Sequence, residues 1–242
     1  MIPRRESDAT RIETFSDAMI GFAATLLVVS LETPRTYEDL VANLWGFVPF
    51  AISFSALFFI WVVHTTLFRR YPLNDAWSIA INGALLFTVL FYVYPLKFMA
   101  SSFVTRFTGV PNPALKSLEQ LQKLFLIYDA GWIVVFALIA LLYVRAYATR
   151  ARLQLTPIES YDAVTYARHY LGFVLAGVVS AVIALSGFGL GMGMPGIAFV
   201  TIGLFAWLNG ELRAPRRRAL EAAERALIPS MTLSGNHPIP TP

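Results

Sequence analysis

The chain has 242 residues, of which 57% are hydrophobic and 14% charged, and its formal net charge is +4. Soluble domains carry about 25% charged residues, and the mean hydropathy here is +0.60, so the composition indicates a membrane protein. Cysteine is absent and histidine occurs three times, which excludes disulfide scaffolds, thiolate metal sites and cysteine nucleophiles and disfavours an all-histidine zinc site.

The first apolar stretch is short and has an acidic residue at each end. It covers residues 18–31, between Asp17 and Glu32, whereas a helix that crosses a bilayer needs about 20 mostly apolar residues. A short span with polar ends is tolerated where protein rather than lipid surrounds it. We therefore expect this helix to be the innermost one of an assembly.

Longer uncharged runs follow along the chain. Residues 40–68 and 76–96 contain no Asp, Glu, Lys or Arg, and residues 124–144 contain only Asp129. The uncharged run 170–210 could cross a bilayer twice at about 1.5 Å rise per residue, and its glycine-rich middle predicts a tight turn. The sequence predicts an all-α protein with six membrane-spanning helices, at about residues 10–32, 40–68, 74–102, 119–147, 166–188 and 194–212.

The helices define one six-helix unit over residues 1–211, followed by a tail over residues 213–242. We expect residues 211–227 to extend the last helix into solvent and the proline-rich residues 229–242 to be disordered. The 19 Lys and Arg residues are distributed unevenly. On one side of the membrane we place only Arg35, Lys97, Arg106, Lys116 and Lys123. The positive-inside rule then puts the tail and both termini in the cytoplasm.

No enzyme motif is present. The sequence has no Walker loop, HExxH or GxSxG motif, and the glycine-rich stretch 187–196 lacks a lysine that could hold phosphate. The basic run 216–218 fits a topology determinant near membrane lipids better than a nucleic-acid patch. We expect neither an enzymatic cofactor nor a nucleic-acid partner.

Helix periodicity puts one apolar stripe on the first helix. At 100° per residue, five side chains fall within about 60° of one another, namely Phe15, Met19, Phe22, Leu26 and Val29, and Thr25 flanks them. Their spacing is typical of a knobs-into-holes seam. Such a stripe usually reflects ordinary helix packing, but on a short, polar-ended helix it favours a position at a central axis. A ring of apolar side chains around an axis can gate by dewetting.

Placing Asp17 of this helix in the membrane costs free energy, because an ionised side chain in a membrane needs a partner. Four polar or aromatic side chains lie at a similar depth on the second and third helices, namely Trp61, His64, Asp75 and Asn82. The sequence predicts a polar cluster behind the first helix. One histidine with two separated carboxylates makes a poor ligand set, so we expect no metal site there.

These residues also carry a family resemblance. Residues 11–17, which contain Arg11, Phe15, Ser16 and Asp17, fit the RxxxFSD signature of the transmembrane protein 175 family, the lysosomal and endosomal potassium channels and their bacterial relatives. Residues 18–29 resemble the family's pore helix. Residues 59–68 resemble its tryptophan-histidine motif, and residues 82–95 its third helix. The resemblance covers about the first 100 residues and matches the single-repeat bacterial type.

The resemblance implies a homotetramer in a bacterial inner membrane, with four copies of the first helix around a potassium-conducting pore and no TVGYG filter. Carried over by position, the constriction falls on Phe22, Leu26 and Val29, and a threonine layer linked to potassium preference falls on Thr25. The signature residues would hold the pore helix against the second and third helices. This sequence departs from the family at three points. It has Phe22 where relatives usually have Ile or Leu, and Val29 where they usually have Leu. Its second helix carries one histidine where many relatives carry two.

Two other functions remain open at the level of the sequence. A proton-coupled transporter or proton leak would use Asp17 and His64, which lie at similar depth. A non-conducting membrane scaffold would explain helix packing without using the apolar stripe as a pore.

Overall fold

The structure, a computed structural model, describes residues 5–29, 35–108 and 115–233. These residues are helical apart from short connections. The helices are α1 (Arg5–Val29), α2 (Tyr37–Arg70), α3 (Ala76–Thr108), α4 (Leu118–Ala148), α5 (Arg150–Leu153), α6 (Pro157–Ser186), η1 (Leu190–Met192), α7 (Met194–Ile197), η2 (Ala198–Val200) and α8 (Thr201–Leu233).

Six segments are long and apolar enough to cross a membrane. Five lie in α1, α2, α3, α4 and α6, and the sixth runs from Met194 in α7 to Ala222 within α8. The fold is therefore an all-α membrane bundle, as the composition predicts. The expected end of the first helix, at residues 30–32, falls outside the described residues. Of residues 229–242, which we expected to be disordered, residues 229–233 are helical and the rest fall outside the described residues.

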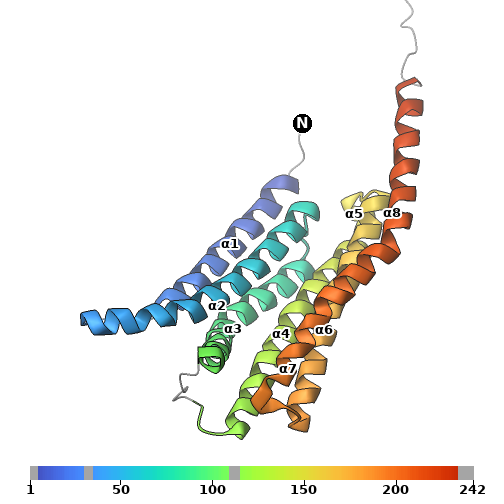
Figure 1. Cartoon of the computed structure of the whole chain (residues 1–242). Coiled ribbons are helices and arrows are strands. Elements are labelled where there is room, and N and C mark those ends of the chain that lie inside the picture. Colours follow the sequence, from blue (N-terminus) through green and yellow to red (C-terminus); the bar gives the residue numbers. More distant parts are fainter. Residues whose placement is uncertain (1–4, 30–34, 109–114, 234–242) are drawn as a thin grey trace, which may run out of the picture.

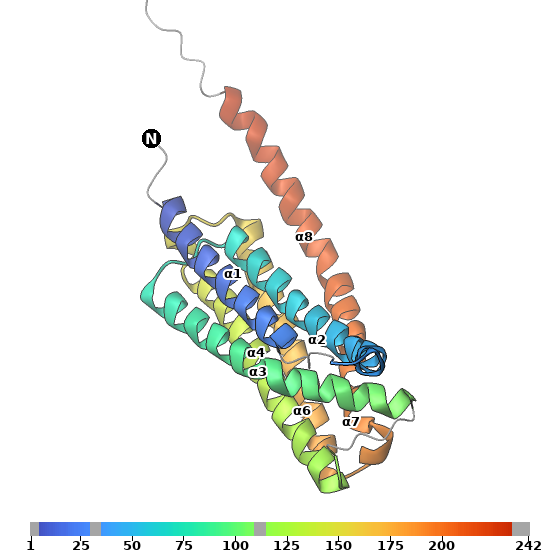
Figure 2. The ribbon, with the colours of Figure 1, turned by 90° about the vertical axis from the view of Figure 1, so that its left-hand side faces the viewer.

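The bundle has two halves (Figure 1). In one half, α1 packs against both α2 and α3, and in the other, α4 packs along α6, which in turn contacts α8. The two halves join where α3 lies along α4. The second half of α8 leaves the bundle and runs beyond the other helices (Figure 2).

Local sequence signals explain where several helices begin and bend. Thr156 and Glu159 form a reciprocal capping box, with Pro157 in the first turn, so α6 starts there rather than near residue 166 as predicted. The charged residues of this first part hid it from a reading based on hydropathy. Within α2, Pro49 removes one main-chain hydrogen bond, which accounts for the bend of that helix (Figure 1).

The connection between the last two spans differs from the single tight turn that we expected. The chain leaves α6 at Gly187, whose φ of 72° suits glycine, and then forms η1, α7 and η2 before α8 begins at Thr201. The last helix continues without interruption to Leu233, which agrees with the extension expected for residues 211–227. Residues 213–233 therefore extend the final membrane helix.

Aromatic side chains and glycines make the close packing between the halves. The largest fully buried side chains include Tyr71, Tyr143, Phe68 and Phe136. On α4, a Cβ at Gly131 would come within 2.2 Å of the Tyr92 ring of α3. Small residues of this kind let membrane helices approach each other, which is how α3 seats against α4.

Candidate functional site

The two faces of α1 have opposite environments. Ser16, Ile20, Ala23 and Leu27, which repeat at helical spacing, are buried against the bundle. Because α1 contacts α2 and α3, this buried stripe is the face with which α1 joins its own subunit. The rest of the circumference of α1 is available for other contacts.

The opposite face of α1 is apolar and open. Phe15, Phe22 and Val29 are 59%, 54% and 72% exposed. Met19 and Leu26, from the same predicted stripe, are instead partly buried and pack against the core. The structure therefore splits the stripe that periodicity assigned to one face, because α2 and α3 cover one edge of it.

Thr25 is exposed beside this open face. Its hydroxyl donates to the carbonyl oxygen of Gly21 at 3.0 Å, within the same helix. The donor is therefore engaged, while the oxygen keeps lone pairs that can accept another group. A hydroxyl in this state presents partial negative charge, which suits contact with a cation.

A buried chain of hydrogen bonds ties α1 to α2 and α3. The Ser16 hydroxyl donates to the carbonyl oxygen of Ile12 at 2.8 Å, and the Asn82 amide Nδ2 donates to Ser16 Oγ at 2.9 Å. Because the amide nitrogen is the donor to Ser16, its Oδ1 faces His64 Nε2 as acceptor at 2.9 Å. This order of donors puts a hydrogen on Nε2 of His64.

A second contact fixes α1 from the side of α2. The Trp61 indole Nε1 donates to Asp17 Oδ1 at 2.8 Å, and its ring lies against Phe58 with centroids 5.3 Å apart. His64, one turn further along α2, stacks on Phe68 at 4.6 Å. We call Ser16, Asp17, Trp61, His64 and Asn82 the α1 clamp.

Asp75 lies outside the α1 clamp, contrary to the prediction from depth. Its carboxylate accepts from Arg145 Nε at 3.0 Å and from the Ser78 hydroxyl at 2.7 Å, and Arg152 lies 3.5 Å away. Burial would raise the pKa of Asp75, but the hydrogen bonds from Arg145 and Ser78 hold it below its usual value. Asp75 thus joins α3 to α4 and α5 rather than to α1.

The other signature residue, Arg11, is exposed on α1. Among the side chains that the structure describes, Arg11 has no ion-pair partner. The clamp therefore involves the second half of the signature, Ser16 and Asp17, and the structure gives no contact that explains Arg11.

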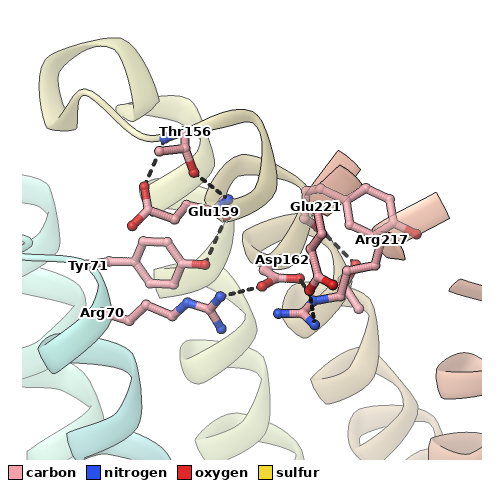
Figure 3. A network of polar contacts seen from close by, with 9 residues as sticks. Arg70, Tyr71, Thr156, Glu159, Asp162, Arg217 and Glu221 are labelled. Atoms are coloured by element: carbon pink, nitrogen blue, oxygen red, sulfur yellow. Dashed lines mark hydrogen bonds and ion pairs between the residues drawn. The ribbon is translucent and has the colours of Figure 1, made fainter. Parts of the chain in front are cut away.

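A further polar network was missed by the sequence analysis (Figure 3). Asp162 of α6, which is almost fully buried, pairs with Arg70 of α2 and with Arg217 of α8, the latter at 3.1 Å. The Tyr71 hydroxyl donates to the Glu159 carbonyl oxygen at 3.0 Å. Burial raises the pKa of the Tyr71 phenol, so it stays protonated and remains a donor. The sequence alone offered no signal for these pairings beyond the charges themselves.

Another buried polar contact lies between α4 and α6. Asp129, the single charged residue of the run 124–144, is fully buried and accepts a hydrogen bond from the Ser180 hydroxyl at 3.0 Å. Its other oxygen, Oδ1, has no hydrogen-bond partner among the described residues.

Comparison with known proteins places the α1 clamp inside a described family. The family model for the endosomal/lysosomal potassium channel TMEM175 matches residues 11–92, which contain every member of the clamp. A potassium channel of Marivirga tractuosa is 39% identical over 166 residues, which is 65% of this chain and 67% of that protein. A potassium channel of Chamaesiphon minutus is 31% identical over 103 residues, and the chain spans about half its length, 51%.

Solved structures show the same architecture. A crystal structure of a variant of the potassium channel MtTMEM175, in complex with a nanobody–MBP fusion protein, superposes with a TM-score of 0.74 at 31% identity and covers 85% of this chain and 93% of that one. The structure of a lysosomal potassium-selective channel TMEM175 homologue from Chamaesiphon minutus has a TM-score of 0.54 at 21% identity, over 84% and 98% of the two chains. The second likeness concerns the fold alone.

Proposed function

The chain belongs to the endosomal/lysosomal potassium channel TMEM175 family, and from this premise we propose that it forms a homotetrameric, potassium-permeable pore with one α1 from each subunit around the axis. The family is one of ion channels rather than enzymes. Six apolar helices and the bacterial relatives make the chain an integral membrane protein of a bacterial membrane. In our proposal this is the inner membrane, with both termini in the cytoplasm.

The observation that carries the proposal is the open face of α1. Phe22 and Val29, which lie in the first membrane span, are more than half exposed in the single subunit. The polar Thr25 is exposed beside this face, and it would be costly against acyl chains. Packing this helix against its own copies covers the apolar face and keeps Thr25 near water.

The α1 clamp supports the same arrangement, because it fixes how α1 is rotated about its own axis. Ser16 is held by Asn82 and Asp17 by Trp61, on the side of α1 that faces its own subunit. With the rotation fixed, Phe22 is presented to the other copies. Leu26 lies about 40° away around the helix at 100° per residue, and a rotation of that size would exchange it with Phe22 at the axis.

We propose that the rings of Phe22 and Val29 gate the pore by excluding water when they close. Leu26, which packs against the core here, would join the constriction when α1 rotates. Four Thr25 oxygens would offer a polar layer to a partly dehydrated potassium ion, since each hydroxyl hydrogen is already given to Gly21. This mechanism needs no TVGYG carbonyl filter and no bound cofactor, and potassium is its permeant ion.

Potassium flux into liposomes tests the proposal. Phe22→Ala should raise the flux several-fold over the wild type, because it removes the largest ring from the constriction. Leu175→Ala is the matched control, since Leu175 is 57% exposed on α6, on the other half of the bundle, and it should leave the flux unchanged. Flux no higher than in empty liposomes for both the wild type and Phe22→Ala would refute the proposal.

Cross-linking tests the position of α1 independently of conduction. The chain has no cysteine, so a single introduced cysteine reports only on its own position. Phe22→Cys should form disulfide-linked dimers between subunits on mild oxidation, whereas Leu175→Cys should not. A monomeric particle in mild detergent, with no cross-link at position 22, would favour the non-conducting scaffold.

The proton-leak alternative has less support from the contacts. Asp17 is bonded to Trp61 and His64 to Asn82, and the described residues contain no hydrogen bond between Asp17 and His64. A pH-gradient assay in liposomes separates the two functions. Asp17→Asn would abolish proton flux if the carboxylate carried it, and an unchanged proton flux removes the alternative.

A further inference from the structure

A cavity of about 560 Å³, lined by many polar side chains, lies between α6 and α8, at the end of the bundle where α8 leaves it. This volume is in the range of small-molecule sites, about 300–1,000 Å³. Its lining combines rings and amides with guanidinium groups and includes Tyr166, His169, Asn209, Arg213, Arg217 and Arg218. The α1 clamp contributes no residue to it.

The acidic groups of the cavity are already paired. Asp162 contacts Arg70 and Arg217, and Glu221 lies 2.6 Å from Arg217 (Figure 3). Arg217 is therefore engaged by two carboxylates. Neither carboxylate has an ion pair with the two remaining arginines of the lining.

Arg213 and Arg218 thus line the cavity without a carboxylate partner among the described residues. Arg213 is partly buried, and Arg217 and Arg218 line the same cavity. Cations gathered in a partly desolvated site are stabilised by an anion. The charges that face the cavity are therefore complementary to an anionic ligand.

The surroundings of the cavity identify the kind of anion. Its lining residues all belong to the α6 and α8 segments that are apolar enough to cross a membrane. An anionic lipid can therefore place its head in the cavity while its acyl chains stay in the bilayer. Guanidinium groups bind phosphate oxygens through paired, charge-assisted hydrogen bonds.

We propose that this cavity binds the phosphate headgroup of an anionic phospholipid, with Arg213 and Arg218 as its ligands. The proposal requires that the chain be a membrane protein, and it does not depend on the tetramer or on conduction. The bound headgroup would hold α8 against α6 at the membrane surface, together with the Asp162–Arg217 ion pair.

Native mass spectrometry of the full chain in neutral detergent tests the proposal by comparing phosphatidylglycerol with phosphatidylcholine. The test variant is Arg213→Gln/Arg218→Gln. The matched control is Arg69→Gln/Arg150→Gln, which removes the same charge from exposed positions at the same end of the bundle and outside the cavity. Inorganic phosphate alone forms a third arm, which separates a soluble anion from a lipid.

We expect the wild type to bind phosphatidylglycerol at least tenfold more tightly than phosphatidylcholine. The test variant should lose about tenfold for each arginine removed, as expected for charge-assisted hydrogen bonds, while the control keeps the wild-type affinity. Equal binding of the two lipids by the wild type would overturn the proposal, and so would an equal loss in the control variant.

Displacement of phosphatidylglycerol by millimolar inorganic phosphate would also overturn it, in favour of a soluble anion. If the glutamine variant fails to fold, thermal unfolding of the wild type tests the proposed lipid binding instead. Its melting temperature should rise with phosphatidylglycerol and not with phosphatidylcholine or phosphate, and an equal rise with all three would count against the site.

Discussion

Replacing Asn82 with alanine tests the contact that sets the rotation of α1. Asn82 is only 3% exposed, and its amide receives a hydrogen bond from His64 and donates one to Ser16. The substitution removes both hydrogen bonds between helices. It also leaves the Nε2–H of His64 without its acceptor in a buried site.

The expected cost follows from these two losses. Hydrogen bonds between membrane helices average about 0.6 kcal/mol each, and a buried donor left without a partner costs about 1–3 kcal/mol. We therefore expect Asn82→Ala to lower the free energy of unfolding by about 2–4 kcal/mol. Reversible unfolding in mixed micelles with increasing SDS measures this quantity.

Thr88→Val is the matched control on the same helix. The Thr88 hydroxyl donates to Ala84 within α3, so its loss breaks no contact between helices and should change stability by less than about 0.5 kcal/mol. A double-mutant cycle of Ser16→Ala with Asn82→Ala should give a coupling of at least about 0.5 kcal/mol. A cost for Asn82→Ala no larger than that of Thr88→Val, with an additive cycle, would refute the reasoning.

Three further substitutions probe other contacts. Trp61→Phe keeps the ring but removes the donor to Asp17, and it should lower the free energy of unfolding by about 0.5–1.5 kcal/mol. Gly131→Ala places a methyl group 2.2 Å from the buried Tyr92 ring, and it should lower the free energy of unfolding by about 1–3 kcal/mol, the cost typical of overpacking. Asp75→Asn should lower the free energy of unfolding at pH 7, and the difference in this free energy between the variant and the wild type should be smaller at pH 3. The sign follows from the lowered folded pKa of Asp75, because its stabilisation is complete above the ordinary value of 3.8 and is lost as the pH falls through the folded value.

Each of these three changes has its own comparison in thermal unfolding. Trp77→Phe removes an indole N–H at a position that is 71% exposed, and it should leave the melting temperature unchanged. Gly203→Ala adds a methyl group to α8 with no atom within 4 Å, and it should be neutral or slightly stabilising. For the acidic residue, the ion-pair explanation would be contradicted if Asp75→Asn and the wild type differed in melting temperature by the same amount at pH 3 and at pH 7.

The six spans and the apolar face of α1 were accessible from the sequence. Uncharged runs identify the spans because lipid excludes charge all along a helix, and a period of 3.6 residues identifies an apolar face on one helix at a time. The resemblance of residues 11–17 to the signature was equally readable, and the family match confirms the family. The start of α6 at Pro157 was missed because its first turns are charged although helical.

The partners of Asp17 and Asp75 show where sequence reasoning ends. Depth in the membrane placed both residues with Trp61 and Asn82, but depth fixes only the position along a helix and not the direction around it. The structure brings Trp61 to Asp17 and turns Asp75 toward Arg145 on α4. Similarly, Asp162 meets Arg70 and Arg217, which lie 92 and 55 residues away along the chain.

The sequence by itself determined that this chain spans a membrane six times, that its first helix has an apolar face, and which family it resembles. Those properties depend on residue type and on spacing within one helix. Only the tertiary structure decided that Asn82 holds Ser16, that Met19 and Leu26 turn toward the core, and that Arg213 and Arg218 line a cavity without acidic partners. Such properties depend on how the helices are rotated against one another, which follows from packing between segments distant in the chain.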